Sequence, residues 1–186
     1  MNQTVAIILI ALLAVAVISF LINLYNKLVL LKFNVDKAYS NIDVVLKQRA
    51  DEIPNLVSVA KSFMNHEKDV LTRLTELRTV YNTTKDSDKK TELANETSKV
   101  LSSFFAVSEN YPELRSNSNF LELQKRISEM ENKISDRREF FNDSINLYNI
   151  GIHEFPNVIL AKMLGYKDKT LLEVTEQEKQ YHGVQF

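Results

Sequence analysis

The chain has 186 residues, with only 3 glycines, 3 prolines, no cysteine and a formal net charge of −1. So few turn formers exclude sandwiches, barrels and doubly wound sheets, which need many tight connections. The missing cysteines exclude disulfides, thiolate metal sites and cysteine lipid anchors, and a near-neutral charge is untypical of nucleic-acid binders. We therefore predict an all-α protein built from long helices.

The N-terminal segment is apolar and carries no charge. No charged residue occurs in the first 24 positions, and residues 5–22 are almost entirely Leu, Ile, Val, Phe and Ala. A stretch of this length can cross a bilayer as a helix. We predict a short leader and a transmembrane helix over residues 1–24. A cleavable signal peptide, with small residues at 14 and 16, is the alternative, but the leader lacks the cationic start of such signals.

Lysines follow the span and none precedes it. Lys27, Lys32 and Lys37 lie on its C-terminal side, so the positive-inside rule predicts a short N-terminus outside and the rest of the chain in the cytoplasm. Tyr25, Lys27 and Lys32 are expected at the membrane interface, where aromatic and cationic side chains are enriched. The first predicted partner is thus the lipid bilayer of the cell membrane, crossed once by the N-terminal helix.

Beyond the span, apolar residues recur at alternating spacings of three and four, which is the pattern of a coiled-coil seam. Four such runs occupy residues 24–45, 56–81, 93–111 and 120–152. Seams of this kind pack as an antiparallel up-and-down helical bundle. We place this bundle at residues 25–165 and a C-terminal tail at residues 166–186.

Prolines and a polar stretch mark the expected helix ends. We predict breaks at Pro54, at the polar residues 83–90, at Pro112 and at Pro156, and a short final helix that ends at Gly165. The apolar phase passes Pro54 almost unbroken, so the first two helices could instead form one kinked rod continuous with the span. We favour four helices over this three-rod alternative, because separate helices bury their apolar stripes more compactly.

Several charged residues fall on or near the seams. They are Asp43, Arg49, Glu67, Glu109, Arg137 and Arg138. A buried charge is costly unless it is paired, so we expect ion pairs that fix the helix register, with Glu109 facing Arg137 or Arg138. The candidate polar network comprises Glu67, Glu109, Arg137, Arg138 and Asn142. The alternative is a ligand pocket lined by Arg137, Glu109 or Asn142.

The sequence offers no recognisable catalytic, cofactor or metal site. His66, His153 and His182 belong to no H-E-x-x-H or Glu-x-x-His motif, and the glycines Gly151, Gly165 and Gly183 form no phosphate loop or nucleophile elbow. We predict a protein that is not an enzyme and needs no cofactor.

Several longer motifs, taken together, are similar to one known family. They are YNKLV at 25–29, AYSNIDV at 38–44, LKQRADEIPNLV at 46–57, ENYPELRSN at 109–117, NFLELQ at 119–124, ENKI at 131–134, RREFFN at 137–142 and FPN at 155–157. In this order they resemble the LemA family of membrane-anchored helical proteins. The pattern departs from the family at Gln48-Arg49-Ala50, where two basic residues and a histidine are usual, and at Phe141, where tyrosine is usual.

The resemblance implies an antiparallel helical bundle with a short N-terminus outside and the main domain inside. One branch of the family, in magnetotactic bacteria, is linked to building internal membranes. Together with the anchor, this predicts a non-enzymatic scaffold or protein-interaction module at the cytoplasmic membrane surface, with a protein partner and no nucleic acid. The alternative function is a sensor that binds a small molecule or lipid headgroup in a polar pocket between helices.

Overall fold

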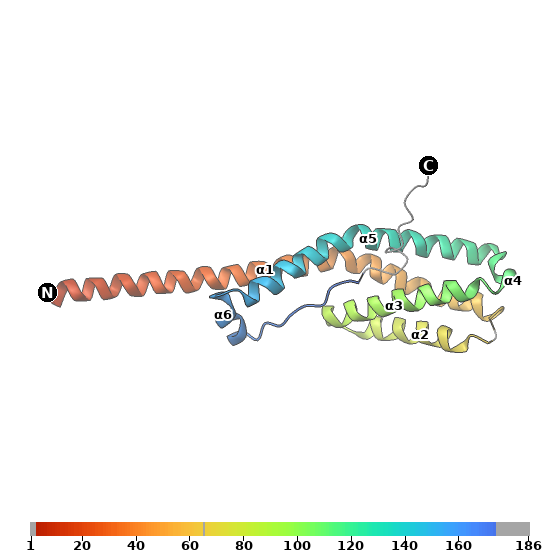
Figure 1. Cartoon of the computed structure of the whole chain (residues 1–186), viewed down its shortest axis with the longest axis horizontal. Helices are drawn as coiled ribbons and strands as arrows, with labels where there is room; N and C mark the ends of the chain where they lie inside the picture. Colours follow the sequence, from red (N-terminus) through yellow and green to blue (C-terminus); the bar gives the residue numbers. More distant parts are fainter. Residues whose placement is uncertain (1–2, 65, 174–186) are drawn as a thin grey trace. The chain divides into compact units, whose positions relative to one another are not determined.

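The computed structural model describes residues 3–64 and 66–173, and every regular element within them is a helix (Figure 1). The helices are α1 (Gln3–Lys61), α2 (Lys68–Thr83), α3 (Ser87–Ser108), α4 (Pro112–Arg115), α5 (Ser118–His153) and α6 (Asn157–Met163). The predicted all-α class is confirmed. The described residues fall into two compact units, the first unit at 3–37 and 143–169 and the second unit at 38–142 and 170–173.

The first part of α1 has the properties of a membrane-crossing helix. By length and composition, α1 is the one described helix long and apolar enough to span a bilayer, and none of its most apolar 18-residue window is buried inside the protein. Ile7, Ile10 and Leu13, for example, are each about two-thirds exposed. In water such a surface would be very unfavourable, whereas lipid would cover it at no cost. The leader residues 1–2 lie outside the described residues.

The predicted helix break at Pro54 is wrong. α1 continues through Pro54 and ends at Lys61, so it is continuous with the apolar N-terminal segment. A proline removes one backbone donor and leaves the carbonyl four residues earlier without a partner. Pro54 itself lies on the exposed face of α1, and Ile53 and Leu56 keep the buried stripe of the helix intact. The actual break follows at residues 62–67, inside the predicted second helix.

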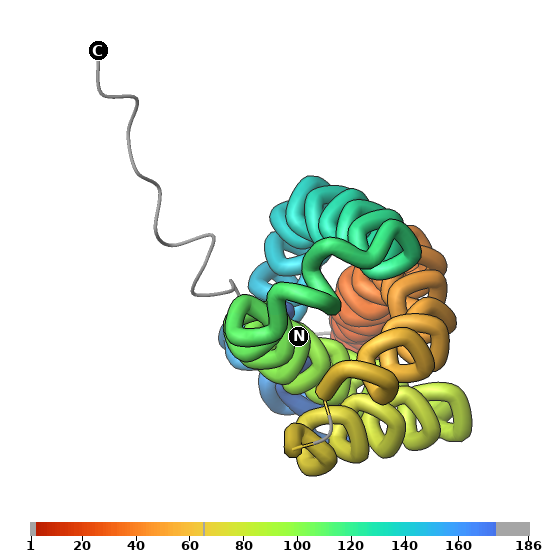
Figure 2. The backbone as a smooth tube through the Cα atoms, turned by 90° about the vertical axis from the view of Figure 1, so that its right-hand side faces the viewer, coloured from red at the N-terminus to blue at the C-terminus, as the bar shows by residue number. Residues whose placement is uncertain are grey.

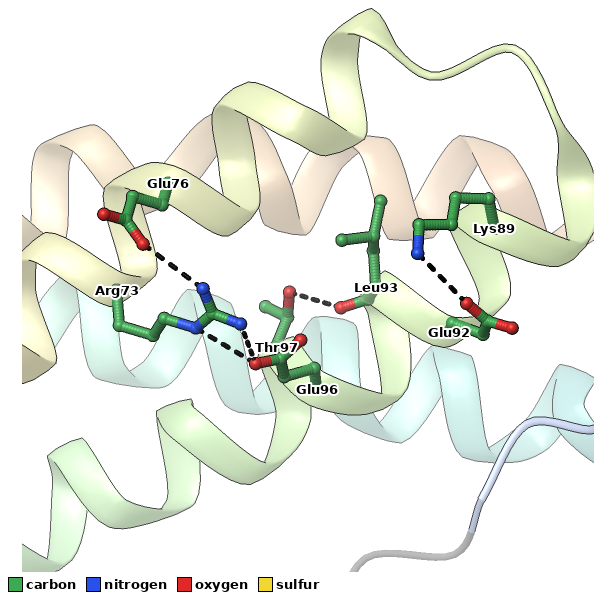
Figure 3. Close-up of polar contacts among 7 residues, drawn as sticks. All are labelled: Arg73, Glu76, Lys89, Glu92, Leu93, Glu96 and Thr97. Carbon is green, nitrogen blue, oxygen red and sulfur yellow. Dashed lines mark hydrogen bonds and ion pairs between the residues drawn. The ribbon is translucent and has the colours of Figure 1, made fainter.

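A short polar turn joins α2 and α3 into a hairpin. Asp86 lies at the N-cap of α3, and its carboxylate accepts a hydrogen bond of 2.8 Å from the backbone N–H of Lys89. Arg73 of α2 forms ion pairs both with Glu76 on its own helix and with Glu96 of α3 (Figure 3). The polar turn predicted at 83–90 is therefore shorter than expected, because α3 already begins at Ser87.

In the second unit, two contacts show the relative direction of α1 and α5. Tyr39 of α1 lies against Phe141 of α5, and Arg49 of α1 bonds to Glu131 of α5. The residue number thus falls along α5 as it rises along α1, so these two segments run in opposite directions. α2 and α3 lie side by side (Figure 2). The up-and-down arrangement of the whole predicted bundle stays a prediction.

The core of the second unit follows the predicted seams closely. Its fully buried side chains include Ile42, Leu46, Ile53, Leu56, Leu74, Leu77, Phe104, Leu114 and Phe120. Phe104 and Phe120 come from α3 and α5, and their ring centroids are 6.3 Å apart. Asn117 caps α5, because its side-chain oxygen accepts a 3.1 Å hydrogen bond from the N–H of Phe120.

In the first unit, the end of α5 packs against α1 at a glycine. Leu31 lies so close to Gly151 that an added Cβ would meet its Cδ1 at 2.3 Å. α6 then ends as predicted at Gly165, which has a φ of +71°. The N–H of Gly165 donates to the carbonyl of Lys162, and that of Tyr166 donates to Ala161, which is the hydrogen-bond pattern of a Schellman cap.

We expect Phe104→Ala to lower the free energy of unfolding by about 3–5 kcal/mol, because it leaves a cavity among side chains that cannot collapse fully. The matched control Leu121→Ala removes a side chain that is half exposed and should change the unfolding free energy by less than about 0.5 kcal/mol. Urea unfolding of the detergent-solubilised full chain measures both. Equal effects of the two substitutions would show that α3 and α5 do not share this core.

Candidate functional site

A carboxylate of α1 gathers three donors in the second unit. Asp43 Oδ1 accepts hydrogen bonds from the Tyr39 hydroxyl at 2.9 Å, the Tyr81 hydroxyl at 2.8 Å and the Lys90 ammonium at 3.2 Å. These donors come from α1, α2 and α3. The Lys90 ammonium also lies 5.1 Å from the ring centroid of Tyr81. One acceptor therefore fixes the relative register of three helices.

This arrangement changes the acidity of each partner. Partial burial alone would raise the pKa of Asp43, but the hydrogen bonds from Tyr81, Tyr39 and Lys90 outweigh it and hold the pKa below its usual value. Burial, together with the nearby carboxylate, raises the pKa of both tyrosine hydroxyls. The cluster is thus most stable when Asp43 is ionised and both tyrosines are protonated.

Arg49 lies in the core of the second unit and is only 2 % exposed. Its guanidinium donates to Ser98 Oγ at 2.6 Å, to Glu131 Oε1 at 2.7 Å and to the carbonyl of Ala94 at 3.0 Å. Glu131 also supplies the opposite charge for this buried cation. The sequence analysis placed Arg49 near the first seam but did not include it in the candidate polar network.

The five residues of the predicted polar network do not gather at one place in the structure. Glu109 is exposed at the C-cap of α3, and Arg137 is exposed and donates to the carbonyl of Asn41 at 2.6 Å. Glu67 is half-buried before α2 and accepts a hydrogen bond from Tyr111. Within the described part of the chain, no ion pair joins Glu109 to Arg137.

The expectation that Arg137 lies on the buried stripe is wrong by one residue. Around this position the buried residues of α5 are Met130, Ile134, Arg138 and Phe141, so Arg138 takes the core position and is 6 % exposed. A straight α-helix has 3.6 residues per turn, so an apolar stripe drifts away from a strict repeat of three and four. The stripe therefore steps by four from Met130 to Ile134 and by four again to Arg138, where the seam was read as a step of three to Arg137.

Arg137 instead borders a surface depression of about 320 Å³ in the second unit. Ala38, Asn41, Asp136 and Phe140 complete its wall. It has the size of a small-ligand site, but it is open to solvent. Arg137 thus borders a depression, but neither Glu109 nor Asn142 is among the residues that line it.

Asn142, the fifth predicted residue, belongs to a different site. Its side-chain amide donates to the carbonyl of Leu172 at 2.8 Å and accepts from the N–H of Leu172 at 2.9 Å. Asn95 of α3 binds the two neighbouring residues in the same way: it donates to the carbonyl of Leu171 at 3.0 Å and accepts from the N–H of Glu173 at 2.9 Å. We call the site formed by Asn95 and Asn142 around residues 171–173 the asparagine groove.

The asparagine groove holds a segment of the predicted tail by its backbone. Residues 171–173 have no regular secondary structure, and the two amides offer them a donor and an acceptor each, as a neighbouring β-strand would. Leu172 is 4 % exposed, and Glu173 forms a 2.6 Å ion pair with Lys99. The site therefore recognises extended backbone, with one apolar pocket for a side chain.

A third asparagine repeats this geometry in the first unit. Asn149 of α5 donates to the carbonyl of Lys169 at 3.1 Å and accepts from its N–H at 2.9 Å. The sequence analysis missed these contacts because it followed apolar periodicity alone. A signal was present, since Asn142 and Asn149 are seven residues apart and so lie on one face of a helix. The predicted tail residues 174–186 lie outside the described residues.

The predicted interface residues lie in the first unit. Tyr25 is half exposed, Lys27 forms a 2.9 Å ion pair with Glu154, and the Lys32 ammonium lies 5.8 Å above the ring of Tyr166. His153 pairs with Asp168 at 2.8 Å, and His66 is exposed. Across residues 3–64 and 66–173, no three His, Asp or Glu side chains are grouped so that they could hold a metal ion. His182 lies outside the described residues.

Comparison with known proteins agrees with the motif reading. A family model described as the LemA family matches residues 38–186. The magnetosome proteins MamQ 1 and MamQ 2 of Paramagnetospirillum magneticum are each 36 % identical to the chain over 67 residues. MamQ of Magnetospirillum gryphiswaldense is 33 % identical over 67 residues. Each match covers 36 % of this chain and 25 % of the relative, so the chain aligns with about a quarter of these proteins.

We expect acid to destabilise the fold through Asp43. Its folded-state pKa is depressed, so its stabilising contribution is present above the unfolded-state value, near pH 4, and is lost as pH falls through the folded-state value. Asp43→Asn should cost about 1–3 kcal/mol at neutral pH and flatten the acid limb of the stability curve. Urea titrations at a series of pH values test this. Asp136→Asn, a change at an exposed carboxylate, should leave the acid limb unchanged.

Proposed function

Because the chain belongs to the LemA family, we propose that it is a non-enzymatic, membrane-anchored interaction module whose second unit binds an extended polypeptide segment of a protein partner. The apolar part of α1 supplies the anchor, and the cell membrane is the proposed location. The bundle is proposed to lie on the cytoplasmic side, as the lysines after the span favour.

One observation supports the interaction role above others, namely the asparagine groove. Asn95 and Asn142 are placed on two helices so that both atoms of each amide meet the same extended backbone. Backbone recognition of this kind is how β-augmentation sites bind many sequences with a few pockets for selectivity. Residues 171–173 would then be the intramolecular occupant of a site that also accepts a partner.

The similarity to the MamQ proteins supports a role at a membrane. They are magnetosome proteins, and the region shared with this chain is short. We therefore transfer from them only the idea of a helical module that works beside a membrane, and propose no magnetosome role for this chain.

A sensor of small anionic molecules or lipid headgroups is the second candidate function. The observation in its favour is the depression beside Arg137, which combines a guanidinium with the aromatic ring of Phe140. We rank it second, because ligand sites generally enclose most of their ligand, whereas this depression is open and the Arg137 guanidinium already donates to the Asn41 carbonyl.

Topology can be tested with single cysteines, because the natural chain has none. We expect a membrane-impermeant maleimide to label Gln3→Cys in intact cells, and to label Lys133→Cys, an exposed position of α5, only after the membrane is opened. The reverse labelling pattern would place the bundle outside the cytoplasm. Labelling of both positions after lysis is the control for reactivity.

Peptide binding in trans tests the groove. A fluorescent peptide of residues 170–186 should bind a chain that ends at Lys169. It should bind the full chain at least about tenfold more weakly, because the attached tail competes at a high effective concentration. Asn95→Ala or Asn142→Ala should abolish binding, while Asn132→Ala, an exposed asparagine of α5, should not. Fluorescence anisotropy gives the affinities, and a shortened chain that binds no peptide would contradict the proposal.

A further inference from the structure

The connection between α5 and α6, together with α6 itself, carries large apolar side chains that are mostly exposed within the described part of the protein. Phe155 is 82 % exposed, Ile159 56 % and Met163 78 %. All three belong to the first unit, which also contains the apolar part of α1. We call these three residues the apolar corner. Exposed apolar groups of this size, close together, are typical of a surface that contacts a partner or a membrane.

Two contacts fix the level of the apolar corner along α1. Gly151 of α5 packs on Leu31, and Glu154 forms its 2.9 Å ion pair with Lys27. The residue number rises along α5 as it falls along α1, so the end of α5 points toward the apolar segment. Phe155 follows Glu154 directly, so its backbone lies within one residue of the ion pair with Lys27.

The contact between Glu154 and Lys27 lies at the level expected for the lipid headgroups. At 1.5 Å per residue, Lys27 is about 8 Å beyond the last residue of the apolar stretch 5–22. The headgroup region on each side of a bilayer is about 5–8 Å thick. A side chain placed at or below the level of Lys27 is consequently within reach of the boundary between headgroups and acyl chains.

The side chains of α1 around this level are consistent with lipid contact. Leu30 is 59 % and Phe33 is 62 % exposed, so apolar surface continues past the span toward the bundle. Lys162, in the last turn of α6, is exposed and basic. Apolar groups flanked by lysines are what an interfacial segment offers to a bilayer with anionic headgroups.

We propose that the apolar corner inserts into the same membrane leaflet surface from which α1 emerges, and so forms a second membrane contact. The occupant of this surface is the lipid bilayer, with Phe155, Ile159 and Met163 at the boundary between headgroups and acyl chains and Lys162 among the headgroups. The protein would thus be held by a span and by an interfacial loop about 130 residues further along the chain. This inference rests on the proposed membrane anchor.

The chain contains no tryptophan, so a single substitution creates a unique fluorophore. The full-length variants Phe155→Trp and Ile159→Trp are reconstituted into vesicles of neutral and anionic phospholipids. The acyl chains either carry no bromine or carry it near their headgroup end. Both tryptophans should lose about half of their emission or more to bromine, as expected for groups at interfacial depth. Leu121→Trp, at an exposed site of the second unit, should lose none.

A fourth variant separates failure of this inference from failure of the anchor. Leu13→Trp lies near the middle of the apolar segment, so bromine placed instead near the terminal ends of the acyl chains should quench it strongly if α1 spans the bilayer. Quenching at Leu13→Trp without quenching at either corner variant would overturn the second membrane contact alone. A blue-shifted emission at the corner that bromine does not reduce would mean that protein covers this surface, and would also overturn it. No quenching at Leu13→Trp would refute the anchor itself.

Discussion

The guanidinium of Arg49 is a full positive charge in the interior of the second unit, and it must be satisfied by groups from other helices. Ser98 and the carbonyl of Ala94 come from α3, and Glu131 comes from α5. Leaving such a charge without its partners would cost several kcal/mol, so sliding any of the three helices past the others is unfavourable. Asp43 adds the same constraint between α1 and the α2–α3 hairpin. Apolar seams alone tolerate such sliding more readily, and the buried charge of Arg49 and the half-buried charge of Asp43 remove this freedom.

Much of the fold followed from apolar spacing. The seams identified most buried positions of α2 and α5, whereas in the second half of α3 the buried face is shifted by one residue, to Leu101 and Ser108. The end of the last helix was found at Gly165, where a glycine readily adopts a positive φ. Pro54 was misread because a proline on the exposed face of a long helix is accommodated when the residues beside it are packed, and sequence alone does not show that packing. Arg137 was misread because a one-residue drift of the stripe exchanges it with Arg138. The candidate site was harder to predict, because Asn95, Asn142 and Asn149 act on backbone groups that have no signature in the sequence.

The two units are stabilised by different kinds of interaction. In the second unit, charge pairing and aromatic packing fix helices whose outer surfaces are polar and charged, as with Arg73 and Glu96. In the first unit, Gly151 allows α5 to approach α1 closely, and Tyr148 is stacked on Tyr166. Large apolar side chains remain exposed there. A membrane-associated protein combines both kinds of surface, since the medium changes from lipid to water along its length.

The three asparagines set an unusual rule for how this sequence can change over evolution. Each reads a backbone N–H, at Lys169, Leu172 and Glu173. Nineteen amino acids supply that N–H and only proline lacks it, so these hydrogen bonds survive any substitution at the three positions except a change to proline. Selection on these hydrogen bonds therefore acts only against proline. Related chains would lack proline at positions 169, 172 and 173, even where they share no residue at these positions.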